Sequence, residues 1–130
     1  MKAGFSFRKV ERISSRKEID LLFEKGKSFT IYPLRVVYAE KAAASGVAAS
    51  VLISVPKKKF KRAVHRNRLK RLIRENYRLR KNALLAVCRQ ENREMNIGFI
   101  YAANEQAATI EIAEAMQKIL LKMTEIIASK

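Results

Sequence analysis

The sequence predicts an α+β fold, in which helices pack against one four-stranded sheet in the order αβββαβα. Two observations carry this prediction. Segments with apolar residues at helical spacing alternate with segments rich in β-branched residues, and a chain of 130 residues has room for one hydrophobic core. We therefore expect residues 1–130 to form a single domain, with residues 1–13 as a flexible basic segment at its start.

The first helix is expected at residues 15–25. Ser15 and Glu18 have the spacing of a capping box, and Gly26 is typical of a helix end. Ile19 and Phe23 recur at helical spacing within it. This segment is therefore predicted to bury one face and to expose the other.

Alternating β-branched, aromatic and apolar residues predict the strands, at 28–32, 34–40, 47–55 and 96–102. Pro33 separates the first two strands, and Gly98 weakens the middle of the last one. Two further helices are expected, at about 63–86 and 109–128. The second of these has an apolar stripe typical of a helix that closes a core.

The positive charge is concentrated in one part of the chain. The sequence contains 28 Lys and Arg against 12 Asp and Glu, for a net charge of +16. Residues 57–81 carry 13 basic residues and one acidic residue. Such an excess predicts a polyanionic partner, either nucleic acid or an acidic membrane surface. A solvated charged surface is disfavoured because ordinary surfaces mix both signs, and a membrane-surface helix is disfavoured because the core needs its apolar side.

At about 100° per residue, the helix from residue 63 places most of its polar residues on one broad face. This predicted face consists of Arg66, Asn67, Lys70, Arg71, Arg74, Arg78 and Lys81. The opposite face consists of Leu69, Leu72, Ile73 and Leu79. Cations spaced about 6 Å apart along a helix suit the phosphates of a nucleic-acid strand.

Several catalytic schemes lack their residues. The chain has one histidine (His65), one cysteine (Cys88) and one aspartate (Asp20). It cannot build a four-ligand zinc site, an internal disulfide or a two-histidine acid–base nuclease. We therefore expect no catalytic residue, no metal site and no cofactor on this chain. The lone Cys88 and the absence of a signal-peptide pattern predict a soluble protein in the reducing cytoplasm.

The segment Arg62-Ala-Val-His-Arg-Asn-Arg-Leu-Lys-Arg-Leu-Ile-Arg-Glu75 resembles the RNR signature of the bacterial ribonuclease P protein component family. The resemblance extends over most of the chain, and only the last 40 or so residues match in pattern alone. It implies a mixed sheet with a left-handed crossover between parallel strands. It also implies a protein subunit that assists removal of the 5′ leader from precursor tRNA by a catalytic RNA, which holds the required Mg²⁺.

The same resemblance implies residue roles. The catalytic RNA would be bound by Arg62, Arg66, Asn67, Arg68, Lys70, Arg71 and Arg74. The single-stranded leader of precursor tRNA would lie in a cleft lined by Ile19, Phe23 and Tyr38. The chain departs from the family pattern where Ile19 replaces a common aromatic residue, and where the loop 58–61 is more basic than in many relatives. It also lacks a basic residue often found within 101–104. No membrane and no obligate protein partner are implied.

Other interpretations remain open from the sequence. Composition alone fits a ribosomal or general RNA-binding protein equally well, and a DNA-binding regulator is a third class that usually shows a helix-turn-helix. Phe23 and Tyr38 fit either a cleft or the core. His65 is expected to be a packed core residue, and Asn67 is expected to contact sugar or phosphate rather than to cap the helix.

Overall fold

The structure, a computed structural model, describes residues 11–13 and 15–129. Its helices are α1 (Arg16–Lys25), α2 (Ala63–Arg80), α3 (Asn82–Gln90) and α4 (Thr109–Ser129). Its strands are β1 (Lys27–Ile31), β2 (Leu34–Glu40), β3 (Ala49–Ser54) and β4 (Met95–Tyr101). The predicted α+β class and element order are confirmed, with the expected long second helix divided into α2 and α3.

The four strands form one mixed sheet in the order β1-β2-β4-β3. β2 is antiparallel to both β1 and β4, whereas β3 and β4 are parallel. The chain passes through α2 and α3 between these two parallel strands, so a helical crossover joins neighbours in the sheet. The left hand of this crossover stays a prediction.

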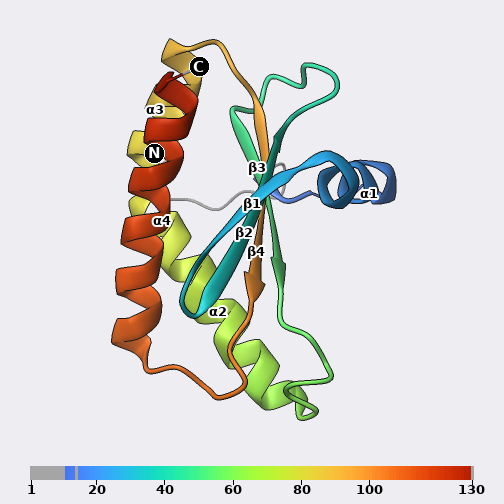
Figure 1. The fold of residues 1–130 in the computed structure, drawn as a ribbon, viewed down its shortest axis with the longest axis vertical. Helices are drawn as coiled ribbons and strands as arrows, with labels where there is room; N and C mark the ends of the chain where they lie inside the picture. Colours follow the sequence, from blue (N-terminus) through green and yellow to red (C-terminus); the bar gives the residue numbers. More distant parts are fainter. Residues whose placement is uncertain (1–10, 14, 130) are drawn as a thin grey trace, which may run out of the picture.

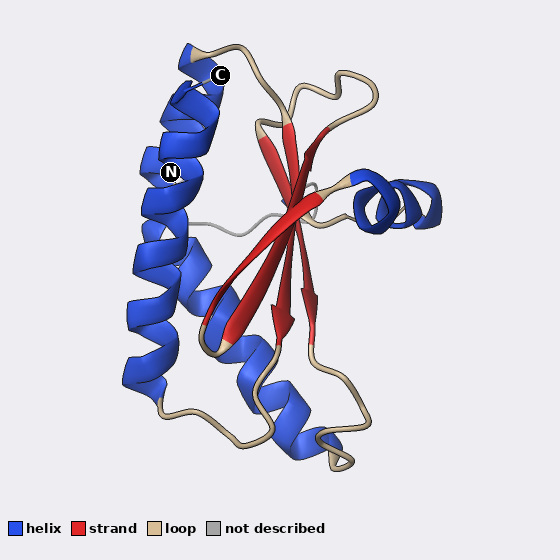
Figure 2. Ribbon diagram, in the orientation of Figure 1, coloured by secondary structure: helices blue, strands red, loops and turns tan. Residues whose placement is uncertain are grey.

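The sheet separates two layers of helix. α2, α3 and α4 lie on one side of it, and α1 lies alone on the other (Figure 1). The main core fills the space between the sheet and the three helices, whereas Ile13, Leu22 and Val37 form a second, smaller core under α1. Because α1 is short, it covers only part of its side of the sheet (Figure 2). Within the described residues, no helix combines the length and the apolar character needed to cross a bilayer.

α1 begins and ends as its sequence predicts. The Ser15 side chain accepts a hydrogen bond from the backbone N–H of Glu18, at 3.3 Å. At the other end, Gly26 comes so close to the sheet that a Cβ there would lie 2.9 Å from Val37 Cγ1 and 3.0 Å from the Tyr38 carbonyl oxygen. Its backbone is extended, with φ −73° and ψ 153°. The glycine is therefore required by close approach and not by a left-handed turn.

The division of the second helix corrects the expected position of Lys81. Lys81 lies between α2 and α3, and its side chain is 1% exposed. Its ammonium group donates to the carboxylate of Glu11 at 2.6 Å. Lys81 therefore belongs to the interior and not to the predicted basic face, because a carboxylate 70 residues away in sequence neutralises it there. A charged group held inside in this way needs its partner.

The end of the expected flexible segment also packs against the domain. Glu11 and Ile13 are buried, and the Ile13 backbone N–H donates to the Val51 carbonyl at 2.9 Å. The prediction of a flexible segment is therefore wrong for residues 11–13, which lie along the edge of β3. Residues 1–10 lie outside the described part of the chain.

Candidate nucleic-acid interface

One side of α2 packs in the core, and the other side is exposed. Leu69, Ile73, Asn76 and Tyr77 are buried. On the opposite side, Asn67 and Arg71 are exposed, and Lys70 and Arg74 are half-buried on the flank. The predicted separation into an apolar and a basic side is thus confirmed for the first three turns of the helix.

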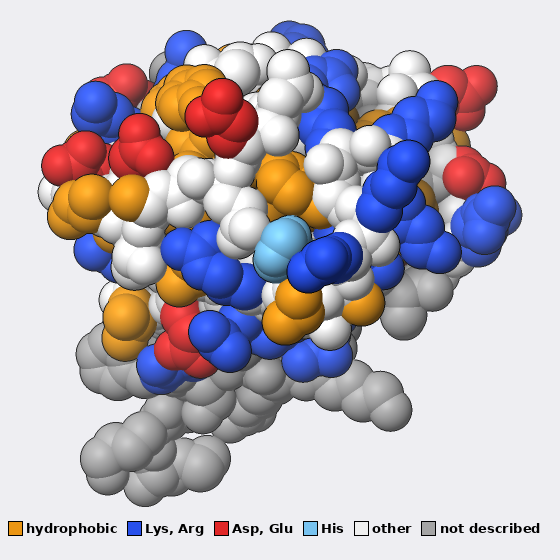
Figure 3. Space-filling model, turned by 90° about the horizontal axis from the view of Figure 1, so that it is seen from below, with side chains coloured by type: hydrophobic (Ala, Val, Ile, Leu, Met, Phe, Trp, Pro, Cys, Tyr) orange, Lys and Arg blue, Asp and Glu red, His pale blue; other side chains and the backbone are white. Residues whose placement is uncertain are grey.

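The basic side chains of α2 and of the loop before it share one end of the molecule. The view from below shows Lys and Arg gathered over this end, with Asp and Glu lying mostly toward the edges (Figure 3). Residues 57–74 include no acidic residue. Among the residues that the structure describes, no carboxylate pairs with Arg62, Arg71 or Arg74. These cations are therefore available to an external anion.

Two arginines of the RNR signature are engaged inside the protein. Arg66 Nη1 donates to the carbonyl oxygens of Phe60 and Lys61, both at 2.8 Å. Arg68 donates to Gln106 Oε1 at 3.1 Å and to the Ala107 carbonyl at 3.4 Å. Arg66 thus holds the loop between β3 and α2, and Arg68 holds the loop between β4 and α4, although both were predicted to contact RNA directly.

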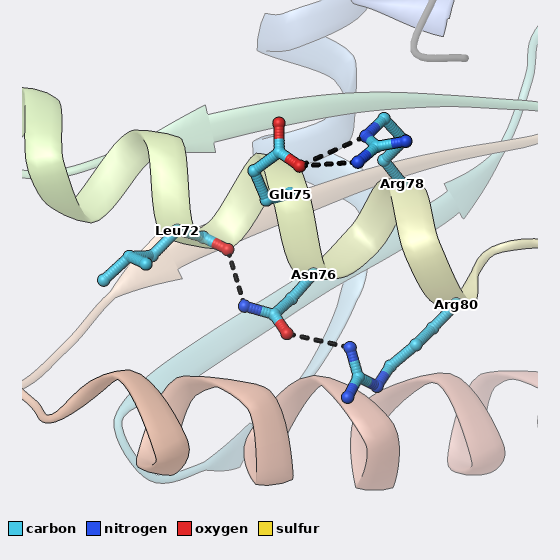
Figure 4. Close-up of polar contacts among 5 residues, drawn as sticks. All are labelled: Leu72, Glu75, Asn76, Arg78 and Arg80. Atoms are coloured by element: carbon cyan, nitrogen blue, oxygen red, sulfur yellow. Dashed lines mark hydrogen bonds and ion pairs between the residues drawn. The ribbon is translucent and has the colours of Figure 1, made fainter. Parts of the chain in front are cut away.

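The second half of α2 is also engaged in internal contacts. Arg78 pairs with Glu75 at 2.7 Å, on the side of the helix away from α4 (Figure 4). On the side facing α4, Asn76 donates to the Leu72 carbonyl and accepts from Arg80, each at 2.8 Å. The free cations are therefore concentrated between the start of α2 and Arg74. We call Arg62, Asn67, Lys70, Arg71 and Arg74 together the basic end.

Two side chains of α2 differ from the helical-wheel expectation. His65, expected in the core, is half-buried and lies at the surface among Lys and Arg, where Figure 3 shows it in pale blue. Leu79, expected on the buried stripe, is 50% exposed. Both lie at the edge of the buried stripe, near the ends of the helix.

The side of the sheet that carries α1 is open at one end. Neighbouring strands place four residues in one row across this end, each paired with the next: Thr30, Arg35, Ile100 and Ser54. Thr30 and Arg35 are exposed, and Ile100 and Ser54 are half-buried. At about 4.8 Å between strands, the row is about 14 Å long. We call these four residues the open row.

Phe23 lies on α1, which packs on the same side of the sheet as the open row. Its side chain is 46% exposed. Ile19 is half-buried and packs in the small core under α1.

Tyr38 does not belong to this surface. It packs against the main core on the opposite side of the sheet, beside Phe29, with the ring centroids 6.0 Å apart. Its neighbour Val37 is the residue that faces α1. The prediction that Tyr38 lines one cleft with Ile19 and Phe23 is wrong, because successive residues of a strand point to opposite faces.

Arg35 was not singled out from the sequence. It is exposed in the centre of the open row, and its Nη2 donates to the hydroxyl of Ser28 at 3.5 Å. The available signal was the alternation along 34–40, which places Arg35 on the same face as Val37. A cation surrounded by uncharged residues on an uncovered sheet face suits a phosphate.

Cys88 behaves as a structural residue. It lies on the buried side of α3, and burial raises the pKa of its thiol, which favours the protonated form. In the described part of the chain, His, Cys, Asp and Glu do not gather in groups of three that could hold a metal ion. The groups that this interface offers for binding are its cations, its hydroxyl groups and the ring of Phe23.

Comparison with known proteins identifies similar chains. The ribonuclease P family model matches residues 7–124. The ribonuclease P protein component of Porphyromonas gingivalis is 42% identical over 121 residues, which cover 93% of this chain and 88% of that protein. The corresponding protein of Thermotoga maritima is 35% identical over 79 residues, which cover 61% of this chain and 64% of that protein.

Solved structures show the same fold. The ribonuclease P protein of Staphylococcus aureus superposes with a TM-score of 0.70 at 24% identity, covering 90% of this chain and 97% of that one. The protein of Thermotoga maritima superposes with a TM-score of 0.67 at 23% identity, covering 86% and 96%. At these identities the likeness concerns the arrangement of helices and strands.

Proposed function

The chain belongs to the bacterial ribonuclease P protein family and is the protein subunit of that endoribonuclease, the partner of the ribonuclease P RNA. From this premise we propose that it binds the RNA through the basic end of α2. We also propose that it binds the 5′ leader of precursor tRNA along the open row, so that the RNA can remove the leader.

The observation that carries the first part is the set of unpaired cations at the basic end. Arg62, Arg71 and Arg74 have no carboxylate partner within the described residues, and the apolar side of their helix is already used by the core. Cations presented in this way neutralise phosphates and release the counterions condensed on the RNA. Binding of this kind also reduces the repulsion between two RNA molecules brought together on one protein.

The open row supports the second part. A single strand is held by cations along its backbone and by aromatic rings on which bases stack. Arg35 supplies a cation, Thr30 and Ser54 supply hydroxyl groups, and Phe23 supplies an exposed ring on α1, on the same side of the sheet. A mature tRNA has no leader to place there, so this surface distinguishes precursor from product.

The chain contributes binding and orientation, and the hydrolytic chemistry belongs to the RNA. We propose that the Mg²⁺ required for cleavage is held by the RNA, because the sequence offers one histidine and one aspartate. We also propose that the protein works in the reducing cytoplasm, which suits a thiol such as Cys88 that is buried and has no second cysteine to pair with.

Changing Phe23→Ala should weaken binding of leader-bearing precursor tRNA to the reconstituted holoenzyme by about tenfold, since stacking contributes roughly 1–3 kcal/mol per base. Affinity for mature tRNA should stay within about twofold, because the lost contact is to the leader alone. The measurement is equilibrium binding of both tRNAs to the same holoenzyme, with each variant matched to the wild type in thermal stability.

Tyr38→Ala is the matched control. It also removes an aromatic ring, but one that lies on the side of the sheet opposite to α1 and Phe23. The ratio of precursor to mature affinity should therefore stay at its wild-type value. Equal weakening of both tRNAs by Phe23→Ala, or a selective loss of precursor with Tyr38→Ala, would place the leader elsewhere.

A further inference from the structure

The loop between β3 and α2, residues 55–62, carries a group of lysines outside the RNR signature. Lys57, Lys58 and Lys61 are exposed. The loop turns tightly, because the backbone N–H groups of Lys59 and Phe60 both donate to the Pro56 carbonyl, at 3.2 and 3.4 Å. Three cations are thus presented on a short, turned segment.

Two contacts anchor this loop to the sheet. Phe60 is 7% exposed and packs edge-to-face on Tyr101, with the ring centroids 5.5 Å apart. The ammonium group of Lys59 donates to the Ala102 carbonyl at 2.7 Å, just beyond the end of β4. Lys57, Lys58 and Lys61, which flank these two anchors in sequence, remain exposed.

Arg66 anchors the loop to α2. One nitrogen of its guanidinium group donates to two successive carbonyls, those of Phe60 and Lys61, both at 2.8 Å. The side chain is half-buried beneath the loop. To bind a phosphate through this nitrogen, Arg66 would have to leave two carbonyl oxygens without their donor, at a cost comparable to losing two hydrogen bonds.

The three exposed lysines have no neutralising partner on the chain. In the described ranges, no carboxylate forms an ion pair with any of them, and the nearest acidic residue after them in sequence is Glu75. They directly precede Arg62 and the first turn of α2, so they extend the positive charge of the basic end along the chain. Clustered cations of one sign are suited to a polyanion.

We propose that residues 57–61 form an RNA-binding loop, in which Lys57, Lys58 and Lys61 contact phosphates of the ribonuclease P RNA. Arg66 is a positioning residue for this loop and acts on the RNA through it. This inference rests on the proposed function, since it needs the chain to bind that RNA. It assigns an RNA contact to three lysines before the RNR signature and an internal role to Arg66 within it.

The test is a double-mutant cycle on binding to the ribonuclease P RNA, measured as a function of salt concentration. One variant neutralises the loop with Lys57→Gln, Lys58→Gln and Lys61→Gln, the second is Arg66→Ala, and the third combines all four changes. The loop variant should bind at least about tenfold more weakly, and its salt slope should fall in magnitude by about two units.

Arg66→Ala should weaken binding by about fivefold in the wild-type background and by less than about twofold in the loop-neutralised background, because its effect passes through the lysines. Arg71→Ala is the control, since Arg71 is exposed on α2 and makes no contact with the loop. It should weaken binding by the same factor in both backgrounds.

The possible results distinguish a failure of the loop proposal from a failure of RNA binding by the whole protein. If the loop variant binds like the wild type, the lysines are only a solvated surface. If Arg66→Ala loses the same factor in both backgrounds, Arg66 contacts the RNA directly. If the wild-type protein itself does not bind the RNA, the proposed function fails instead. The exposed Lys→Gln changes leave the fold intact, so the loop can be tested even where Arg66→Ala lowers stability.

Hydrogen exchange in the free protein supplies a second measurement. Arg66→Ala should speed exchange of the Lys59 and Phe60 amide hydrogens, because the loop loses its anchor on α2. Arg71→Ala should leave both rates unchanged. Unchanged rates in Arg66→Ala would contradict the positioning role.

Discussion

Gly26→Ala should lower the free energy of unfolding by about 3 kcal/mol, at the upper end of the usual cost of overpacking. The added methyl group would meet the carbonyl oxygens of Leu22 and Tyr38, which belong to the helix and the sheet backbone and cannot rotate away. α1 would have to move off the sheet, and the small core around Leu22 and Val37 would open. Chemical denaturation followed by circular dichroism measures this loss.

Gly98→Ala is the matched control for this change. Gly98 lies on β4 under the same helix, but a Cβ there would lie 3.4 Å from Leu22 Cδ2 and 3.8 Å from the Val37 carbonyl oxygen, the second an ordinary van der Waals distance. Because the Leu22 methyl group can adjust to that contact, the change should lower the free energy of unfolding by no more than about 1 kcal/mol. A similar cost for both glycines would show that close approach at Gly26 does not decide how α1 docks.

The triple change Arg62→Ala, Arg71→Ala and Arg74→Ala should weaken binding to the ribonuclease P RNA by about 100-fold or more at moderate salt. The plot of log affinity against log salt should lose about 2 to 3 units of slope, because each phosphate contact contributes about 0.7–0.9. All three side chains project from the basic end and have no carboxylate partner among the described residues. The fold should be retained, since none of them belongs to the core.

A second triple variant removes three positive charges from other parts of the surface. Lys17, Arg89 and Lys118 are exposed on α1, α3 and α4, and changing all three to Ala gives the same net charge as the first variant. Its salt slope should stay within about one unit of the wild-type value, because distant charges make no phosphate contacts. Equal losses in the two variants would mean that total charge, and not the basic end, governs RNA binding.

Local sequence patterns predicted most of the fold. The capping box at Ser15, the β-branched strands and the apolar stripe of residues 109–128 each depend on neighbours in sequence, and each formed the expected element. The order of the strands needed more than local pattern. The mixed sheet was expected from the resemblance to a family, and the pairing of β3 with β4 confirms it.

What sequence reasoning missed depends on contacts between distant segments. The helical wheel placed Lys81 outside, because it could not show that Glu11 lies beside it. The resemblance placed Arg66 and Arg68 against RNA, and the sequence could not show the carbonyls to which they donate, because these belong to separate loops. Tyr38 was on a correctly predicted strand, but which face of that strand meets α1 is decided by packing and not by alternation alone.

We expect this chain to act as a binding subunit that lets the ribonuclease P RNA act on leader-bearing precursor tRNA. The most direct measurement is the cleavage rate of precursor tRNA at low Mg²⁺, with the protein alone, the RNA alone and both together. We expect no cleavage by the rigorously RNA-free protein and a rate with both components well above that of the RNA alone, because the cations of the basic end offset phosphate repulsion. Robust cleavage by the protein alone, or no gain when the protein joins the RNA, would contradict this role.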